Sequence, residues 1–288
     1  MKVIGGSASI ALARGIAREL SVGFIDVAFE RHPGGFPDGE RYVRVVGSVE
    51  GEHVILVQTT HPDSMIVELL LLADAVRDAG ARRVTAVVPY YGYGRQDKRF
   101  LAGEAISAKT IAKHIGVGCD ELVTMTIHNP EVLKTFPVPS RDVDGIPAIG
   151  RYLKGMDVDL LVAPDENAIR LVKTASAICG KPYDYFEKRR IDSHTVRIAP
   201  KKLAVKEKSV AIIDDVISSG GTIATAAREL RVQGARRVIA ACVHGLFLGN
   251  AEASFNACDD VVATDTILSK YSKVSVASEF SEAIRTLA

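Results

Sequence analysis

One five-residue segment occurs twice in this chain, and it constrains the fold more than any other feature. Residues 80–84 read Gly-Ala-Arg-Arg-Val, and residues 234–238 read the same. Each copy follows a helical pattern and begins an apolar strand, and another apolar strand lies upstream, at residues 54–57 and 210–213. A repeat in a matching context indicates that one structural unit was duplicated. We therefore expect two tandem domains of one fold.

Short apolar runs alternate with helical segments along both halves of the sequence, for example a strand at residues 84–88 and a helix at residues 106–115. This alternation predicts an α/β fold with mostly parallel sheets. We expect an N-terminal domain over residues 1–142 and a C-terminal domain over residues 143–277. The last helix, residues 278–288, is expected to pack back on the first domain.

Composition excludes several classes of protein. The chain has 288 residues, of which 47% are hydrophobic and 25% charged, as in globular proteins with ample cores. A net charge of +1 indicates no nucleic-acid partner. The longest apolar run, around residues 69–73, is far too short to cross a membrane. The four cysteines are widely spaced and form no CxxC pair, which favours a reducing, cytoplasmic location.

The richest chemical pattern lies at residues 209–234. An apolar strand, residues 210–213, is followed by two acids, then by a loop of hydroxyl residues and glycines, then by a helical segment at residues 223–233. Unpaired N–H groups at a helix start bind anions, and glycines let a phosphate approach the backbone. The acids, which we expect to form a turn, would face sugar hydroxyls or Mg²⁺. Ribose 5-phosphate carries both kinds of group. The alternative is a capped helix behind a solvated acidic turn.

Four other segments carry chemistry with weaker signals. A loop after the strand at residues 84–88 combines two Tyr-Gly pairs with cations at residues 91–99, which favours phosphate binding over a solvated basic loop. Residues 187–190, Glu-Lys-Arg-Arg, open a charged loop that is either a solvated face or a cover for a polyphosphate. His128 and Asp165 each follow an apolar strand, and either residue alone is more typical of structure than of a metal site.

Together these segments resemble the ribose-phosphate pyrophosphokinase family, from Phe36 to about Gly249. The matching blocks are Phe-Pro-Asp-Gly-Glu at 36–40, Tyr-Gly-Arg-Gln-Asp-Lys at 93–98, Ile-His at 127–128, Pro-Asp at 164–165, Glu-Lys-Arg-Arg at 187–190 and the loop that begins at Asp214. The family fold is two domains of the type I phosphoribosyltransferase kind. The chain departs from the family at Ser218, where many relatives carry an acid, and after Asp165, where glycines are expected. Its length is closer to archaeal members.

The resemblance implies Mg²⁺-dependent transfer of the diphosphoryl group of ATP to the C1 hydroxyl of ribose 5-phosphate, for nucleotide biosynthesis. It also implies a homo-oligomer, a dimer or larger, with the adenine met by a neighbouring subunit. The roles it assigns are catalysis by Lys188; ATP binding by Asp38, Gly39, Glu40, Arg95 and Gln96; metal binding by His128 and Asp165; and ribose 5-phosphate binding by Arg190, Asp214, Asp215, Ser218, Ser219, Gly220, Gly221 and Thr222.

Two other functions remain open. A phosphoribosyltransferase would use the same loop, but it needs neither a second domain nor the Arg95 and Gln96 block. A catalytically silent, regulatory relative would bind partners instead of turning over, and the presence of Lys188, Arg190, His128 and Asp214 argues against it.

Overall fold

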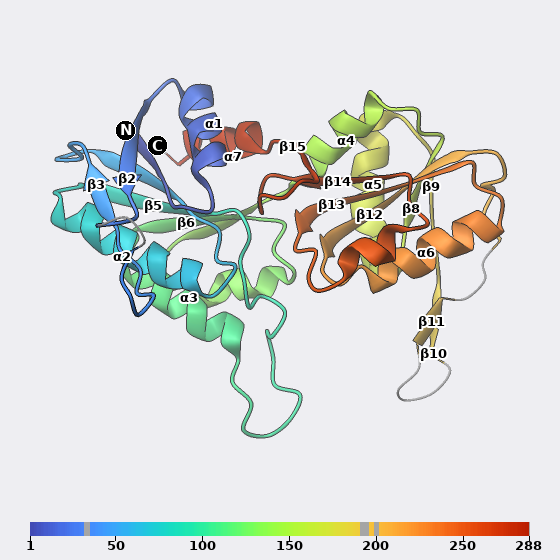
Figure 1. Ribbon diagram of the computed structural model, residues 1–288, viewed down its shortest axis with the longest axis horizontal. Helices are drawn as coiled ribbons and strands as arrows, with labels where there is room; N and C mark the ends of the chain where they lie inside the picture. The colour runs from blue at the N-terminus through green and yellow to red at the C-terminus, as the bar shows by residue number, and fades with distance from the viewer. Residues whose placement is uncertain (32–34, 191–195, 199–201, 288) are drawn as a thin grey trace. The chain divides into compact units, whose positions relative to one another are not determined.

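The computed structural model describes residues 1–31, 35–190, 196–198 and 202–287, with the backbone alone at 188–190 and 196–198. The chain divides into two compact units, each described by itself below (Figure 1). Unit 1 comprises Met1–Asp144 and Ser275–Ala288, and unit 2 comprises Gly145–Val274.

Unit 1 is built on a seven-stranded sheet in the order β3-β2-β1-β4-β5-β6-β7. All neighbouring strands are parallel except β2 and β3, which are antiparallel. The central strands β4 and β6 are buried along their whole length, as expected where helices cover both faces. The strands are β1 (Lys2–Gly5), β2 (Gly23–Ala28), β3 (Arg44–Val46), β4 (His53–Val57), β5 (Arg83–Val88), β6 (Glu121–Met125) and β7 (Ser140–Val143).

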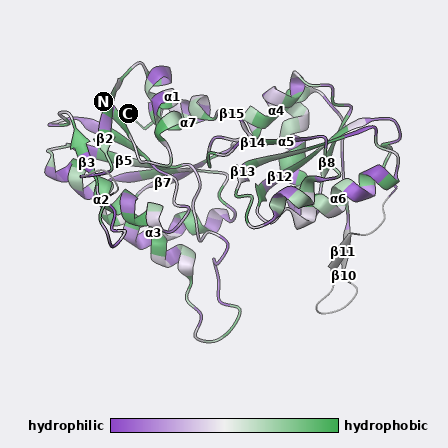
Figure 2. Ribbon diagram, in the orientation of Figure 1, coloured by the Kyte–Doolittle hydropathy of each residue, from purple (hydrophilic) through white to green (hydrophobic). Residues whose placement is uncertain are grey.

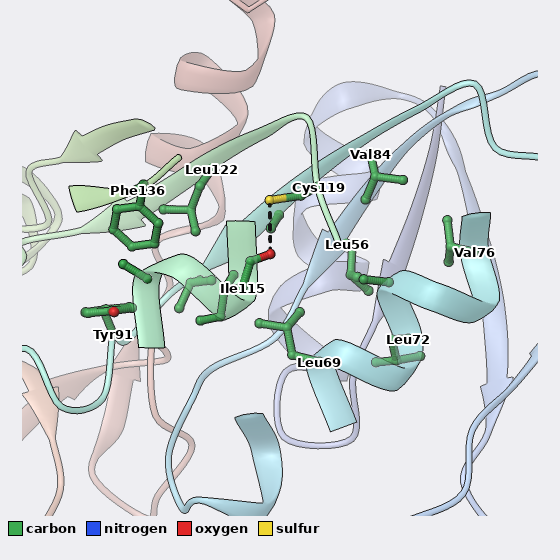
Figure 3. Packing of buried hydrophobic residues seen from close by; sticks show 14 of the residues in the cluster. Leu56, Leu69, Leu72, Val76, Val84, Tyr91, Ile115, Cys119, Leu122 and Phe136 are labelled. Carbon is green, nitrogen blue, oxygen red and sulfur yellow. Dashed lines mark hydrogen bonds between the residues drawn. The ribbon is translucent and has the colours of Figure 1, made fainter. Parts of the chain in front are cut away.

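The helices of unit 1 bury their apolar faces against this sheet. Leu69, Leu72 and Val76 of one helix pack with Leu56 and Val84 of the sheet, as Figure 3 shows. The next helix, residues 107–117, ends near Cys119. The Cys119 thiol donates a hydrogen bond to the carbonyl of Ile115 at 3.6 Å. The C-terminal helix packs against the first one. The helices are α1 (Ile10–Leu20), α2 (Ser64–Asp78), α3 (Ser107–Val117), the 3₁₀ turn η1 (Pro130–Thr135) and α7 (Ala277–Arg285).

Unit 2 has a six-stranded parallel sheet in the order β15-β14-β13-β12-β8-β9. Its long central strands β12 and β13 are strongly hydrophobic, whereas helix α6 alternates apolar and polar residues (Figure 2). A separate antiparallel pair, β10 and β11, projects from this unit (Figure 1). The strands are β8 (Leu160–Ala163), β9 (Tyr183–Tyr185), β10 (Lys188–Arg190), β11 (Val196–Ile198), β12 (Ser209–Ile217), β13 (Arg237–Gly245), β14 (Asp260–Thr264) and β15 (Ser272–Val274). The helices are α4 (Ile146–Lys154), η2 (Glu166–Ala168), α5 (Ile169–Cys179), α6 (Gly221–Val232) and η3 (Ala251–Phe255).

The two sheets have the same topology. If β3 is set aside, the order β2-β1-β4-β5-β6-β7 in unit 1 matches β9-β8-β12-β13-β14-β15 in unit 2. The repeated pentapeptide enters equivalent strands, β5 and β13. The prediction of two tandem α/β domains with mostly parallel sheets is therefore confirmed. In each sheet the strand order reverses at one place, between β1 and β4 and between β8 and β12. Open parallel sheets bind ligands at such a switch point.

Two local predictions were wrong. Asp214 and Asp215 lie inside β12 and not in a turn, because β12 continues beside β13 after its other neighbour, β8, has ended. Lys188 and Arg190 lie on β10, paired with β11, where a loop was expected. Neither prediction could succeed from the apolar runs alone, because in both cases the strand is sustained by pairing with another strand and not by its own hydrophobicity.

Candidate functional site

The switch point of unit 2 gathers three carboxylates. Asp214 is in register with Cys242 of β13, and Asp215 follows it on the opposite face of the strand. Asp165 lies two residues after the end of β8, is buried, and caps η2 by accepting a hydrogen bond from the N–H of Asn167 at 2.8 Å. Burial, the charge and hydrogen bond of Asp215, and the charge of Asp165 raise the pKa of Asp214 well above its ordinary value. This edge of the sheet therefore favours a bound cation or hydroxyl donors.

The loop after β12 leaves its backbone donors uncommitted. Ser219, Gly220, Gly221 and Thr222 donate from their N–H groups to no acceptor among the residues that the structure describes. The loop itself is held in place, since Ser254 donates to the carbonyl of Ser219 at 3.0 Å. A fixed row of free N–H groups at the start of α6, with the positive end of the helix dipole behind it, is suited to bind an anion.

Gly220 makes this loop geometry possible. It caps α6 with φ = +79°, a left-handed conformation that other residues adopt at a cost. A Cβ atom on Gly220 would lie 2.8 Å from Cβ of Ser254, whereas a Cβ on Gly221 would meet nothing closer than Oγ of Ser219, at 3.9 Å. Gly220 is therefore required by the protein itself, and Gly221 leaves open space on the outer side of the loop. Ser219, Gly221 and Thr222 are exposed and Ser218 is half-buried.

The phosphate-loop pattern has no counterpart at the switch point of unit 1. There, the fully buried carboxylate of Glu68 accepts from the backbone N–H and the hydroxyl of Ser7, both at 2.7 Å, and from the amide of Gln58 at 2.8 Å. The Glu68 carboxylate thus already accepts hydrogen bonds from the Ser7 and Gln58 groups that could otherwise donate to a ligand. An acid among the apolar residues 65–73 of this helix was the sequence signal for this, and it was missed.

Glu68 also reaches the turn at residues 36–40. Arg41, the next residue, lies 3.7 Å from the Glu68 carboxylate and donates to Ser64 at 3.0 Å. The turn is closed by a hydrogen bond of 3.0 Å from the N–H of Gly39 to the carbonyl of Phe36. Asp38, Gly39 and Glu40 are all exposed on it, and a neighbouring aromatic, Phe36, is half-buried against Tyr42. The turn therefore presents an aromatic ring beside polar acceptors.

The loop that carries Arg95 and Gln96 is anchored at both ends. Gly92 donates from its N–H to the hydroxyl of Thr60 at 2.7 Å, and a Cβ on Gly92 would lie 2.6 Å from the Thr60 carbonyl oxygen. Farther along, the carbonyl of Gln96 accepts from the N–H of Ala108 at 3.2 Å. Arg95 is exposed and Gln96 half-buried, so the guanidinium is available to a polyphosphate.

His128 follows β6 in unit 1 and is exposed. Its neighbour Asn129 donates a side-chain hydrogen bond to the carboxylate of Asp97, which lies in the loop of Arg95 and Gln96. Tertiary structure therefore brings two predicted ATP-binding residues and one predicted metal ligand to the same edge of unit 1. Asp97 belongs to the block that carried the resemblance, but neither it nor Asn129 was predicted as a site residue.

The remaining predicted residues are placed only in part. Lys188 and Arg190 are in register with Ile198 and Val196 across the β10–β11 pair, and their side chains lie outside the described residues. Among the described residues, no three His, Cys, Asp or Glu side chains form a ready metal site. Mg²⁺ commonly uses one or two carboxylates with water and substrate phosphates, so Asp165 and the acidic pair suit it in chemistry. In the described part of the chain, no helix is both long and apolar enough to cross a membrane.

Comparison with known proteins agrees with this picture over the whole chain. Residues 1–117 match the family model described as the N-terminal domain of ribose phosphate pyrophosphokinase, and residues 148–274 match the phosphoribosyl transferase domain. The chain is 39% identical to a ribose-phosphate pyrophosphokinase of Methanopyrus kandleri, covering 100% of this chain and 99% of the relative. It is 42% identical to one from Methanosarcina acetivorans, covering 100% of both.

A solved structure is similar over the same extent. The phosphoribosylpyrophosphate synthetase from Mycobacterium smegmatis superposes with a TM-score of 0.80 at 27% identity, covering 99% of this chain and 98% of that one. Sequence and structure thus match from end to end, across both units. The chain belongs to the ribose-phosphate pyrophosphokinase family of enzymes.

Proposed function

We propose that this enzyme transfers the β,γ-diphosphoryl group of ATP to the C1 hydroxyl of ribose 5-phosphate, with Mg²⁺, to give phosphoribosyl pyrophosphate and AMP. The observation that carries the proposal is the free N–H loop beside Asp214 and Asp215, in a chain similar throughout its length to ribose-phosphate pyrophosphokinases. We further propose that it works in the cytoplasm as a homo-oligomer and supplies nucleotide biosynthesis.

Ribose 5-phosphate would bind at the switch point of unit 2. Its phosphate would accept from the N–H and hydroxyl groups of Ser218, Ser219, Gly220, Gly221 and Thr222, where the helix dipole favours negative charge. Asp214 and Asp215 would accept hydrogen bonds from the ribose hydroxyls. The crowding of carboxylates that raises the pKa of Asp214 would be relieved by these donors and by a bound cation. Arg190 would add positive charge beside the sugar phosphate.

ATP would bind to unit 1. The exposed turn of Asp38, Gly39 and Glu40 would meet the adenine, since polar acceptors beside the ring of Phe36 suit an aromatic base with an amino group. Arg95 would pair with phosphate oxygens and Gln96 would donate its amide hydrogens. His128 in this unit and Asp165 in unit 2 would each serve a Mg²⁺ site, and bound Mg²⁺ would neutralise charge on phosphate oxygens.

The chemistry demands positioning more than acid–base catalysis. The C1 hydroxyl oxygen forms a bond to the β-phosphorus of ATP, the bond from that phosphorus to the α–β bridging oxygen breaks, and AMP leaves while the hydroxyl loses its proton. Negative charge spreads over the oxygens of the group in transit. Lys188 would stabilise that charge, because a cation supplied where charge develops lowers the barrier more than one that binds the ground state.

Product analysis tests the proposal directly. ATP and Mg²⁺ are incubated with the enzyme, with and without ribose 5-phosphate, and nucleotides are separated. AMP formed only in the presence of the sugar phosphate is the expected result. ADP would mean γ-phosphoryl transfer and would refute the mechanism. If no nucleotide is consumed, a phosphoribosyltransferase or a silent relative becomes the better description, and the two differ in whether phosphoribosyl pyrophosphate is used up with a nucleobase.

A further inference from the structure

The long loop between β5 and α3 has few attachments beyond its roots. At its start, the ring of Tyr91 packs on Phe136 with centroids 5.3 Å apart (Figure 3), and its hydroxyl donates to the carbonyl of Ala108 at 2.6 Å. At its far end, the side chain of Glu104 accepts from N–H groups of the loop itself, including those of Phe100 and Leu101. The tip is accordingly exposed, with 65% of Phe100 and 71% of Leu101 accessible.

One side-chain contact ties the middle of this loop to the end of β6. The amide nitrogen Nδ2 of Asn129 donates to Oδ2 of Asp97, and both residues are half-buried. The other atom of the same amide, Oδ1, accepts from the N–H of Glu131 at 3.0 Å and so caps η1. Asn129 is therefore held by the helix that follows it, and its nitrogen is presented to the loop in one orientation.

The surroundings strengthen this contact. The hydrogen bond from Asn129, together with the nearby charge of Lys98, lowers the pKa of Asp97, so this carboxylate is ionised at neutral pH. A hydrogen bond to an ionised acceptor is about twice as strong as a neutral one. Asp97 directly follows Gln96, and Asn129 directly follows His128, so fixing one pair fixes the other.

We infer that Asn129 is a positioning residue, which through its hydrogen bond to Asp97 holds the Arg95–Gln96 loop beside His128 in the arrangement that binds ATP. This inference rests on the proposed function for the identity of the ligand, but the tether itself does not. Neither Asn129 nor Asp97 needs to touch the nucleotide. The contact acts by reducing the number of loop conformations that binding must select among.

Three variants separate the tether from other roles of these residues. Asn129→Asp keeps the size and the oxygen that caps η1, but it sets a carboxylate against Asp97. Asp97→Asn removes the charge and still allows an amide–amide hydrogen bond. The double exchange, Asp97→Asn with Asn129→Asp, restores a charged hydrogen bond with its polarity reversed. A tether requires that Asn129→Asp be the most damaging of the three and that the exchange repair it.

The first readout is the equilibrium dissociation constant for ATP with Mg²⁺, without ribose 5-phosphate. We expect Asn129→Asp to weaken binding by at least about tenfold, the equivalent of one charge-assisted hydrogen bond. Asp97→Asn should weaken it less, and the exchange should return it to within about threefold of the parent. Unchanged affinity in Asn129→Asp overturns the inference. The inference is also overturned if the double variant binds ATP as weakly as Asn129→Asp, because ATP binding would then require the charge of Asp97 and not its hydrogen bond to residue 129.

The second readout is hydrogen exchange of the loop amides in the absence of any ligand. Asn129→Asp should speed hydrogen exchange of the amides of residues 93–104 and leave that of β6 unchanged. The double variant, Asp97→Asn with Asn129→Asp, should slow hydrogen exchange of the loop again. This measurement tests the tether even if the parent protein binds no ATP. Such a protein would contradict the proposed function but not the tether. Equal exchange rates in the parent and in Asn129→Asp would show that the loop does not depend on this contact.

Discussion

Substituting alanine at Gly220 should destabilise unit 2, whereas the same substitution at Gly221 should not, although the two residues are neighbours in one loop. At Gly220, alanine must adopt φ = +79°, which costs about 1–2 kcal/mol. Its Cβ would also lie 2.8 Å from Cβ of Ser254, closer than side-chain carbons approach one another, and relieving such overpacking costs about 1–3 kcal/mol. The two costs together predict a loss of about 2–5 kcal/mol in the unfolding free energy of unit 2.

Gly221 is the matched control. It is the first residue of α6, its φ is not positive, and a Cβ there would be at least 3.9 Å from any neighbour. Alanine at this site adds no clash and is the better helix former, so stability should be unchanged or rise by up to about 1 kcal/mol. If ribose 5-phosphate binds over this loop, however, the added methyl group should weaken its binding.

Urea denaturation of both variants, followed by fluorescence or circular dichroism, measures the difference. Because the chain has two units, the transition of each is fitted separately, and the transition of unit 1 serves as an internal reference. Equal unfolding midpoints for Gly220→Ala and Gly221→Ala would refute the reasoning, because the same substitution would then cost the same with and without a left-handed backbone and a steric clash.

Three other substitutions test the buried carboxylates of Glu68 and Asp214 and the proposed catalytic role of Lys188. Glu68→Ala strands the N–H of Ser7 and should cost unit 1 about 3–5 kcal/mol in urea denaturation, against less than about 1 kcal/mol for Glu131→Ala at an exposed ion pair. Lys188→Ala should keep ATP affinity and lose most turnover; near-normal kcat would contradict its role. The raised pKa of Asp214 stabilises the fold at low pH, and this stability is lost as pH rises through that pKa. Asp214→Asn should therefore be more stable than the parent at pH 7 without Mg²⁺ and lose this advantage towards pH 4; a constant difference would count against it.

Some candidate site residues could be predicted from the sequence because their chemistry is local. Gly220 and Gly221 stand between hydroxyl residues directly after an apolar strand, so the free N–H groups follow from consecutive positions along the chain. The same holds for Arg95 and Gln96, which share one loop. By contrast, Asn129, the partner of Asp97, is more than thirty positions away in the sequence, and neither segment contains a pattern that predicts contact with the other. Pairwise contacts of this kind are invisible to a reading of local patterns.

The sequence by itself determined the duplicated α/β architecture and predicted an anion-binding loop in unit 2. Hydrophobic periodicity, chain order and the repeated pentapeptide are properties of the sequence itself, and they suffice to predict alternating strands and helices in two tandem domains. They also suffice to place this chain beside a known family.

Tertiary structure alone decided how charge is distributed at the two switch points. In unit 2, pairing with β13 extends β12 and holds Asp214 and Asp215 in a strand, close enough to Asp165 to raise a pKa. In unit 1, folding buries Glu68 against Ser7 and closes the equivalent place. The physical reason is that strand pairing and desolvation depend on segments far apart in the chain, and the free energy of a buried carboxylate depends on the donors and charges that those segments bring to it.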